Sequence, residues 1–282
     1  MKLLRYGPAG QEKPGLLDRD GKIRDLSGAV RDIDGETLAP ASLDRLRRLD
    51  PSTLPLVPGT PRLGPSVARV SKLVTIGLNY RAHAAETGAA IPKEPIFFMK
   101  ATTSICGADD DVIIPKGSQK TDWEVELGIV IGTLARYVPA HDASKYIAGY
   151  CVVNDVSERE FQIERGGQWT KGKSADTFAP IGPWVVTADE VPDPGNLGLW
   201  TEVNGKRVQN SNTSDLIFGI NEIVSYVSHF MTLLPGDIIP TGTPSGVGLG
   251  MKPPQFLKSG DRMRLSVEGL GEQNQRLVAF AG

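Results

Sequence analysis

The chain has 282 residues, with 31 lysines and arginines against 33 aspartates and glutamates. This near balance, without any basic run, argues against nucleic acid and anionic membranes as partners, so we expect a small-molecule partner. The first residues lack the apolar segment of a secretory signal and no apolar run is long enough to span a bilayer, which predicts a soluble cytoplasmic protein. Only Cys106 and Cys151 are present, too few for a disulfide framework, and we expect buried free thiols.

The N-terminal segment predicts a small β-rich unit followed by a short helix. Leu3–Tyr6 and Pro14–Leu17 have the apolar character of strands, and the turn at Asp20-Gly21 leads into a third strand at Lys22–Leu26. This pattern is typical of a hairpin. Leu43–Leu49 is expected to form a short helix.

A proline-rich stretch separates this unit from the rest of the chain. Five prolines between residues 51 and 65 predict an extended connector. We therefore place a small N-terminal β-rich domain with its connector at residues 1–64 and a larger domain at residues 65–282. From Val70 onward short apolar strands dominate, and helical spacing of apolar residues predicts one clear helix from Asp215 to Leu234.

Acidic residues alternate with apolar residues in the middle of the chain. Asp122, Glu124 and Glu126 are spaced by two, so a strand would place all three on one face, and Asp155 follows a later apolar run. Carboxylates set in apolar sequence need a partner, because desolvating a lone carboxylate costs several kcal/mol. The pattern predicts a site for a hard divalent metal. An acidic strand face that meets water is the alternative.

A glycine-bounded segment, Gly77–Gly88, holds a second chemical group. If its middle is helical, His83 and Glu86 stand three residues apart on one face, where the carboxylate can orient the imidazole and stabilise its charged form. The pair is then a candidate general base on a mobile segment. A surface hydrogen bond is the alternative.

The segment Gly167–Ser174 matches the phosphate-loop pattern G-x-x-x-x-G-K-S, but its flanks do not fit. A nucleotide-binding loop leaves an apolar strand and opens a helix, whereas Glu164–Gly166 precedes this segment and Phe178–Pro183 follows it. We expect Lys173 to meet an anionic substrate or an enolate oxygen instead. A solvated loop lysine is the alternative.

A loop of small residues, Pro240–Gly248, lies close to the C-terminal end of the predicted long helix. Its backbone N–H groups and hydroxyls could hold a carboxylate. Tight turns use the same residues, so both interpretations stay open.

Taken together, these stretches resemble the fumarylacetoacetate hydrolase family from about Val74 to the C-terminus. The motifs that carry the resemblance are Gly77–Tyr80 with His83 and Glu86, Pro95–Lys100, Glu124 with Glu126, Asn154–Arg159, Gly172–Ser174, and Pro235–Asp237 leading to Thr241–Pro244. The resemblance implies a fold that is mainly β with some α, a mixed β-sandwich roll of this family's type, beside the N-terminal β-rich domain. It also implies a homodimer.

The resemblance further implies roles for individual residues. Glu124, Glu126 and Asp155 would bind Mg²⁺ or Mn²⁺, with Asp122 a nearby acid that does not touch the metal. His83 and Glu86 would form a catalytic dyad on a lid, with Lys173 as the active-site lysine. The expected substrate contacts are Gln162, Thr243 and Arg159.

A narrower resemblance is to bacterial hydrolases of 2,4-diketo-3-deoxy-sugar acids, of the rhamnonate and fuconate type. Lys120–Glu126 and Gly166–Lys173 carry it. One departure concerns another branch, whose acylpyruvate-cleaving members carry a basic residue where this chain has Leu78. Fold-level kinship does not fix the reaction.

The expected chemistry starts from the acids themselves. Three carboxylate oxygens leave positions on a magnesium ion that the carboxylate and keto oxygens of a 2-oxo acid can fill. Cleavage beside the keto group gives a pyruvate enolate, which the cation and Lys173 would stabilise. With a second carbonyl at C4, His83 and Glu86 could activate water for attack there, giving hydrolysis of a carbon–carbon bond in a 2,4-dioxo acid.

Three alternatives remain at this stage. Oxaloacetate decarboxylation reaches the same enolate without water attack, and a 2-hydroxy-dienoate isomerase or lyase would use the same metal site. A purely structural cation in a binding or scaffold protein is the third alternative.

Overall fold

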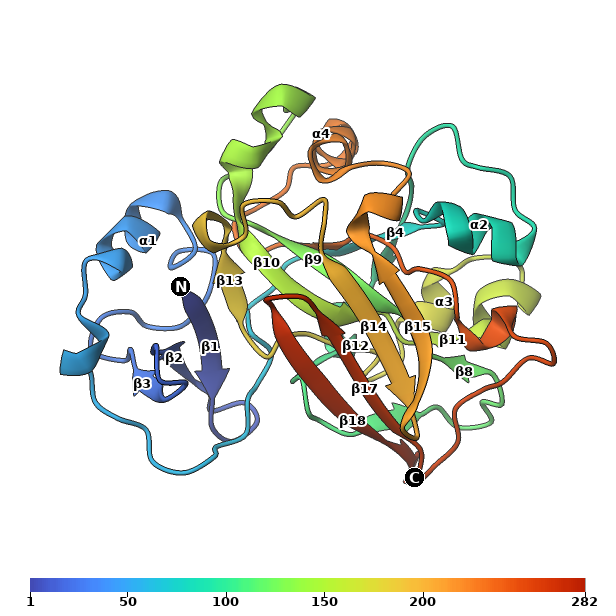
Figure 1. Ribbon diagram of the computed structural model, residues 1–282, viewed down its shortest axis with the longest axis horizontal. Helices are drawn as coiled ribbons and strands as arrows, with labels where there is room; N and C mark the ends of the chain where they lie inside the picture. Colours follow the sequence, from blue (N-terminus) through green and yellow to red (C-terminus); the bar gives the residue numbers. More distant parts are fainter. Residues whose placement is uncertain (282) are drawn as a thin grey trace.

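Two β-sheets form the framework of the structure, a computed structural model that describes residues 1–281 (Figure 1). The larger sheet has nine strands in the order β3-β2-β1-β13-β10-β9-β16-β4-β5, and the smaller has five in the order β15-β14-β17-β18-β7. The strands of the larger sheet are β1 (Lys2–Tyr6), β2 (Lys13–Leu17), β3 (Ile23–Asp25), β4 (Leu73–Gly77), β5 (Ile96–Lys100), β9 (Val125–Ile131), β10 (Ile147–Asn154), β13 (Val185–Thr187) and β16 (Ile238–Pro240). The strands of the smaller sheet are β7 (Val112–Ile114), β14 (Gly198–Val203), β15 (Lys206–Asn212), β17 (Arg262–Val267) and β18 (Gly271–Ala279).

Short strand pairs and helices complete the structure. The pairs are β6 (Ile105–Cys106) with β12 (Ala179–Pro180) and β8 (Thr121–Asp122) with β11 (Ser157–Glu158). The helices are α1 (Pro40–Arg47), α2 (Arg81–Thr87), α3 (Thr170–Lys173), α4 (Ile220–Phe230), a π-helix at Glu160–Glu164, and 3₁₀ turns at Pro51–Thr53, Thr102–Ser104, Ala140–Tyr146, Ala188–Glu190, Thr213–Asp215 and Gly248–Gly250. The predicted fold class, mostly strands with few helices, is confirmed.

The N-terminal strands continue the larger sheet. β2 pairs antiparallel with β3 across the Asp20-Gly21 turn, as the predicted hairpin requires. β1 pairs antiparallel with β2 and also with β13, where Lys2 lies opposite Val186. The predicted short helix is present as α1, which begins earlier than expected because Pro40 suits the first turn of a helix. The division of the chain at residues 64 and 65 stays a prediction.

Strands β9 and β10 form the centre of the molecule, and all their residues are buried. Successive side chains of a strand point to opposite faces. Leu127 and Ile129 therefore enter the core between the two sheets, where Leu265 of β17 also lies. Glu126 and Val130 take the opposite face, and Val130 packs in the core shared with the N-terminal region. The acidic residue of β9, Glu126, thus lies on the face that is not covered by the smaller sheet.

The predicted helix from Asp215 to Leu234 is too long, since α4 covers only Ile220–Phe230. At its start, the backbone N–H of Phe218 donates to the Asn79 side chain, which holds that residue outside the helix. Beyond its end, Leu233 pairs with Ala135 in an isolated β-bridge. Tertiary contacts at both ends therefore override the helical pattern of the sequence.

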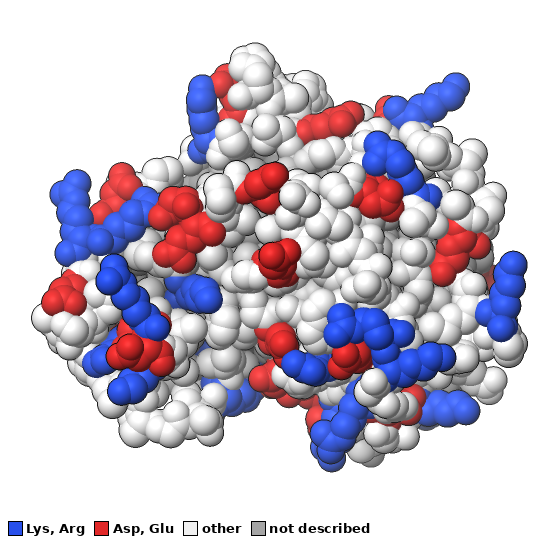
Figure 2. All heavy atoms as spheres, viewed as in Figure 1, with Lys and Arg blue, Asp and Glu red and all other residues white. Residues whose placement is uncertain are grey.

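Surface charges are mixed, in keeping with the formal net charge of −2. On the face shown in Figure 2, blue and red side chains alternate without a large area of one sign. Cys106 and Cys151 are buried free thiols, as predicted. Among the described residues, no helix is long and apolar enough to cross a membrane.

Candidate metal centre and active site

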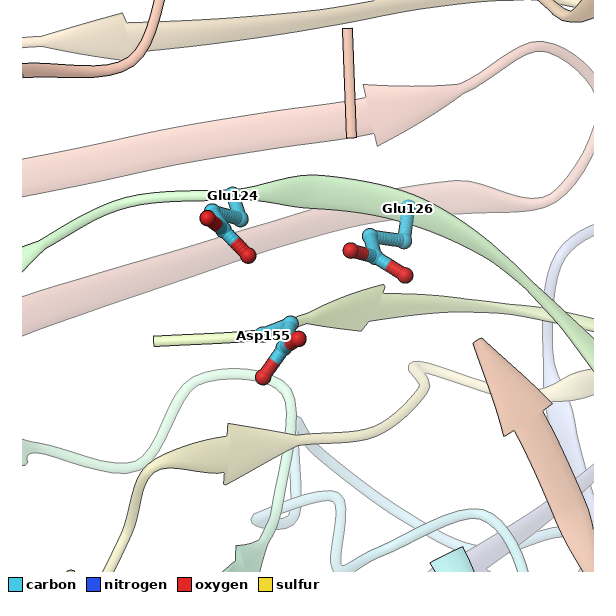
Figure 3. A group of neighbouring side chains, drawn as sticks. All are labelled: Glu124, Glu126 and Asp155. Atoms are coloured by element: carbon cyan, nitrogen blue, oxygen red, sulfur yellow. The ribbon is translucent and has the colours of Figure 1, made fainter. Parts of the chain in front are cut away.

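Three carboxylates converge where β9 begins and β10 ends (Figure 3). The antiparallel pairing of these strands sets Val153 opposite Glu126, and the backbone N–H of Asp155 donates to the Glu124 carbonyl at 2.9 Å. One oxygen from each of Glu124, Glu126 and Asp155 lies within 4.8 Å of the others. All three residues are at most 5% exposed. The structure thus brings together the three residues expected to bind metal.

The surroundings of these acids fit a divalent cation. Burial and the neighbouring charges of Asp155 and Glu124 raise the pKa of Glu126 well above its usual range. Its carboxylate accepts a hydrogen bond from the backbone N–H of Gly242 at 2.8 Å, which offsets only part of this cost. A hard cation with oxygen ligands, such as Mg²⁺ or Mn²⁺, would remove the repulsion and keep further positions for water or a substrate.

Two buried lysines contact the same acids. Lys173 Nζ lies 2.6 Å from Glu124 Oε2 and 2.8 Å from Asp155 Oδ2, and Lys100 Nζ lies 2.5 Å from Asp155 Oδ1. Burial lowers the pKa of Lys100 despite its contact with Asp155. For Lys173, burial also acts to lower the pKa, but Asp155 and Glu124 outweigh it and raise the pKa.

Lys100 was not among the candidate residues, although it lies within one of the family motifs. The signal that could have found it is a lysine at the end of an apolar strand, Ile96–Lys100. Lysine is almost never fully buried without a partner, so this position implies a buried carboxylate nearby.

Arg159 supplies a third cation and joins the acids to a separate carboxylate, Asp122. Arg159 Nη2 lies 2.8 Å from both Glu124 Oε1 and Asp122 Oδ2. Burial alone would raise the pKa of Glu124, but Lys173 and Arg159 outweigh it and hold this pKa at about 2. Glu124 is therefore ionised over the range in which metal binding would be measured.

The expectation that Asp122, Glu124 and Glu126 share one face of a continuous strand is wrong. The strand is interrupted between Asp122, where β8 ends, and Val125, where β9 begins. The Asp122 carboxylate instead accepts backbone hydrogen bonds from Gly248 at 2.7 Å and Leu249 at 3.0 Å. Asp122 therefore binds two partners, the loop that follows β16 and the Arg159 guanidinium. It lies outside the three-acid cluster.

The His83–Glu86 pair forms on α2 as the spacing predicts. His83 Nδ1 lies 3.2 Å from Glu86 Oε2, and the other Glu86 oxygen accepts a hydrogen bond from the Gly246 backbone N–H at 2.9 Å. His83 is 7% exposed and faces the same cavity as the three acids. The alternative of a solvated surface pair does not fit this burial.

The small-residue loop after β16 does hold carboxylates, and they are the protein's own. Backbone N–H groups of Gly242, Gly246 and Gly248 donate to Glu126, Glu86 and Asp122, respectively. Gly246 has a φ of +98°, and a Cβ there would lie 2.0 Å from the Val208 carbonyl oxygen, so only glycine fits. We name residues 242–249 the carboxylate loop. Through these contacts it connects the three-acid cluster, helix α2 and, by way of Asp122, Arg159.

The candidate site lines one cavity of about 300 Å³. The three expected substrate contacts, Gln162, Thr243 and Arg159, all reach it. Gln162 accepts a hydrogen bond from Arg159 Nη1 at 3.1 Å, and the Thr243 hydroxyl donates to the Val125 carbonyl at 3.0 Å. Their roles toward a substrate stay predictions.

The rejected phosphate-loop interpretation has no support in the local structure. The residues Gly167–Ser174 include only the four-residue helix α3, and a π-helix at Glu160–Glu164 comes before them in place of a strand. Lys173, the lysine of that pattern, points to Glu124 and Asp155 instead.

Comparison with known proteins agrees with this geometry. A family model described as fumarylacetoacetate (FAA) hydrolase C-terminal matches residues 72–278. A Burkholderia ambifaria protein named as a hydrolase is 63% identical over 276 residues, covering 98% of each chain.

Two solved structures are similar over almost the whole chain. The fumarylacetoacetate hydrolase of psychrophilic Exiguobacterium antarcticum has a TM-score of 0.88 and 33% identity, covering 99% of this chain and 100% of that chain. The maleylpyruvate hydrolase of Sphingobium sp. SYK-6, in complex with manganese(II) ion and pyruvate, has a TM-score of 0.82 and 29% identity, covering 100% of both chains. The specific resemblance to sugar-acid hydrolases stays a prediction. Because the family model covers well over half of its length and the relatives match it nearly end to end, the chain belongs to the fumarylacetoacetate hydrolase family.

Proposed function

We propose that this protein is a hydrolase, dependent on Mg²⁺ or Mn²⁺, that cleaves a carbon–carbon bond in a 2,4-dioxo acid and releases pyruvate. The observation that carries the proposal is the arrangement of three groups around one cavity: the buried acids, Lys173, and His83, which is paired with Glu86 behind it. The Sphingobium relative, whose structure holds manganese and pyruvate, supports the same substrate class.

Glu124, Glu126 and Asp155 would hold the cation. When bound, the cation supplies Lewis-acid polarisation of the substrate's carboxylate and 2-keto oxygens. Lys100 fixes the orientation of Asp155, because its ammonium donates to both Asp155 Oδ1 and the Val156 carbonyl. The protein thus presents its ligands in a fixed geometry, which lowers the reorganisation needed at binding.

Lys173 is placed to stabilise negative charge on the pyruvate half. Cleavage of the C3–C4 bond leaves its electron pair on C3, and the resulting enolate carries that charge on the 2-keto oxygen. The Lys173 ammonium is buried, lines the cavity and lies against two metal ligands, so it can donate a hydrogen bond in a site of low dielectric.

His83 is placed to act as the general base. Its Nδ1 faces Glu86, so Nε2 is the atom that can take a proton from water as the water oxygen attacks the C4 carbonyl. Glu86 stabilises the imidazolium that forms, and the Gly246 N–H fixes Glu86. Breakage of C3–C4 then yields a carboxylic acid and the enolate, which takes a proton at C3 to give pyruvate.

The test is pyruvate release from a short 2,4-dioxo acid by protein stripped with EDTA, before and after Mg²⁺ is added, with oxaloacetate assayed in parallel. Release from the dioxo acid that depends on Mg²⁺ supports the proposal. Release from oxaloacetate alone would make the protein a decarboxylase. No release from either would favour the isomerase, lyase or structural-cation alternatives.

A further inference from the structure

Two chemically different sets of side chains line the cavity. One set is ionisable and consists of the three acids with Lys173, Arg159 and His83. The remaining wall is formed mainly by apolar side chains from four segments of the chain. These side chains are Ile76, Leu78, Phe98, Ile163, Trp169 and Leu249.

The apolar wall is held in place by aromatic packing. The ring of Trp169 meets that of Phe98 edge-on, with centroids 5.4 Å apart and an interplanar angle of 67°. Trp169 also lies against Gly77, where a Cβ would come within 2.4 Å of the indole. The missing side chain at Gly77 therefore makes room for Trp169, which fixes the shape of this wall.

The positive charges around the cavity are already engaged. Lys173 and Arg159 lie within 2.8 Å of site carboxylates. Arg81, at the start of α2, donates to the Leu216 carbonyl at 2.6 Å, and Arg165 lies 2.6 Å from Glu160. Within residues 1–281, the cavity lining includes no further lysine or arginine that could receive a second anionic group of a ligand.

We infer that the substrate carries a short, uncharged apolar tail beyond its second carbonyl, and neither a second carboxylate nor a hydroxylated chain. This inference rests on the proposed function. A carboxylate placed against the apolar wall would be desolvated without a partner, and hydroxyl groups would lose hydrogen bonds to water. The cavity has a volume of about 300 Å³, enough for the dioxo-acid core and a few more carbons.

Turnover of three matched substrates tests the tail directly. The first is 2,4-dioxoheptanoate, with a propyl tail, and the second is 2,4-dioxoheptanedioate, in which a carboxylate replaces the terminal methyl. The third is a 2,4-dioxo acid with a dihydroxypropyl tail. We expect kcat/KM for the propyl substrate with Mg²⁺ to exceed each of the others at least tenfold. A preference for the dianion or the hydroxylated tail would overturn the inference and leave the proposed hydrolase function standing.

Binding of ligands that cannot be cleaved separates the two proposals. 2-Oxoheptanoate and 2-oxoheptanedioate lack the second carbonyl and differ only in the terminal group, so calorimetry with the Mg²⁺-loaded protein reports the tail preference without turnover. We expect the monoanion to bind at least tenfold more tightly. Equal or tighter binding of the dianion overturns the inference, and absence of binding by both overturns the proposed function as well.

A charge introduced into the wall should reverse the preference. Ile163 is 49% exposed, so a polar residue fits there without being forced into the core. Ile163→Arg should raise the dianion-to-monoanion ratio of kcat/KM at least tenfold, whereas Ile163→Gln, a polar but neutral control, should change it little. An equal effect of the two variants would contradict the electrostatic explanation.

Discussion

At the scale of single residues, His83 separates the proposed reaction from its alternatives. We predict that His83→Ala lowers kcat for hydrolysis of a 2,4-dioxo acid by about 10²–10⁴, the usual contribution of a general base. Oxaloacetate decarboxylation should fall much less, because it needs no water attack. Steady-state assays of both reactions make the comparison, and equal losses would mean that His83 acts in binding or lid closure.

Glu86→Gln is the matched variant for this pair. The amide can still accept the hydrogen bond from Gly246 but carries no charge to stabilise the imidazolium. The rate of hydrolysis should therefore fall while helix α2 keeps its position.

Glu126 is the acid that most needs a cation, since burial and two neighbouring carboxylates raise its pKa. With wild-type protein, Mg²⁺ at 100 times its Kd should raise the free energy of unfolding by about 2.7 kcal/mol. Glu126→Gln should remove most of this gain, because the amide is neutral and a weaker ligand. Thermal melts with and without Mg²⁺ measure this gain in stability. The control is Glu222→Gln, at an exposed position on α4. An unchanged response in Glu126→Gln would argue against the metal site.

At the scale of structural elements, the carboxylate loop connects the three-acid cluster, helix α2 and Arg159. Asp122 anchors its far end through the N–H groups of Gly248 and Leu249 and through the Arg159 guanidinium. Asp122→Asn would set an amide N–H against these donors and leave Arg159 poorly paired.

We expect Asp122→Asn to lower the free energy of unfolding by about 3–5 kcal/mol, as for other broken buried pairs. Urea denaturation measures this loss. Asp44→Asn, where the side chain is 62% exposed and pairs with Arg47, should change stability by only about 0.5 kcal/mol. A similar small effect at Asp122 would show that the loop holds its conformation without this anchor.

At the scale of the whole molecule, the free edge of the larger sheet offers a surface for self-association. β5 is the last strand of that sheet, and exposed Ile96 and Phe230 lie there, with the Phe97 and Phe230 ring centroids 5.7 Å apart. Unpaired strand edges and exposed apolar patches are common protein interfaces. The homodimer expected from the family resemblance remains a proposal, and this is the surface we assign to it.

Light scattering after gel filtration should give about twice the chain mass of 30.3 kDa. Phe230→Glu should shift the protein to the monomer, while Phe280→Glu, which is also at an exposed position, should not. A monomeric wild-type protein at micromolar concentration would refute the assignment.

The sequence could predict features that depend on neighbours along the chain. The spacing of Glu124 and Glu126 was enough to predict that their carboxylates lie together, and the three-residue spacing of His83 and Glu86 was enough to pair them on a helix. The N-terminal hairpin likewise follows from its apolar strands and the turn at Asp20-Gly21. The family resemblance added Gln162 and Arg159 to the list of candidates and assigned individual roles to Asp155 and Lys173.

What only the tertiary structure decided concerns contacts between distant segments. The break in the strand at Asp122, the burial of Lys100 against Asp155 and the end of α4 at Phe230 all depend on partners that lie far away in the chain. The strength of such contacts comes from burial and from the pairing of charges in a site of low dielectric, which residue spacing does not record. The sequence by itself thus determined the chemistry that this protein carries, while the packing of β9, β10 and the carboxylate loop decided how that chemistry is assembled.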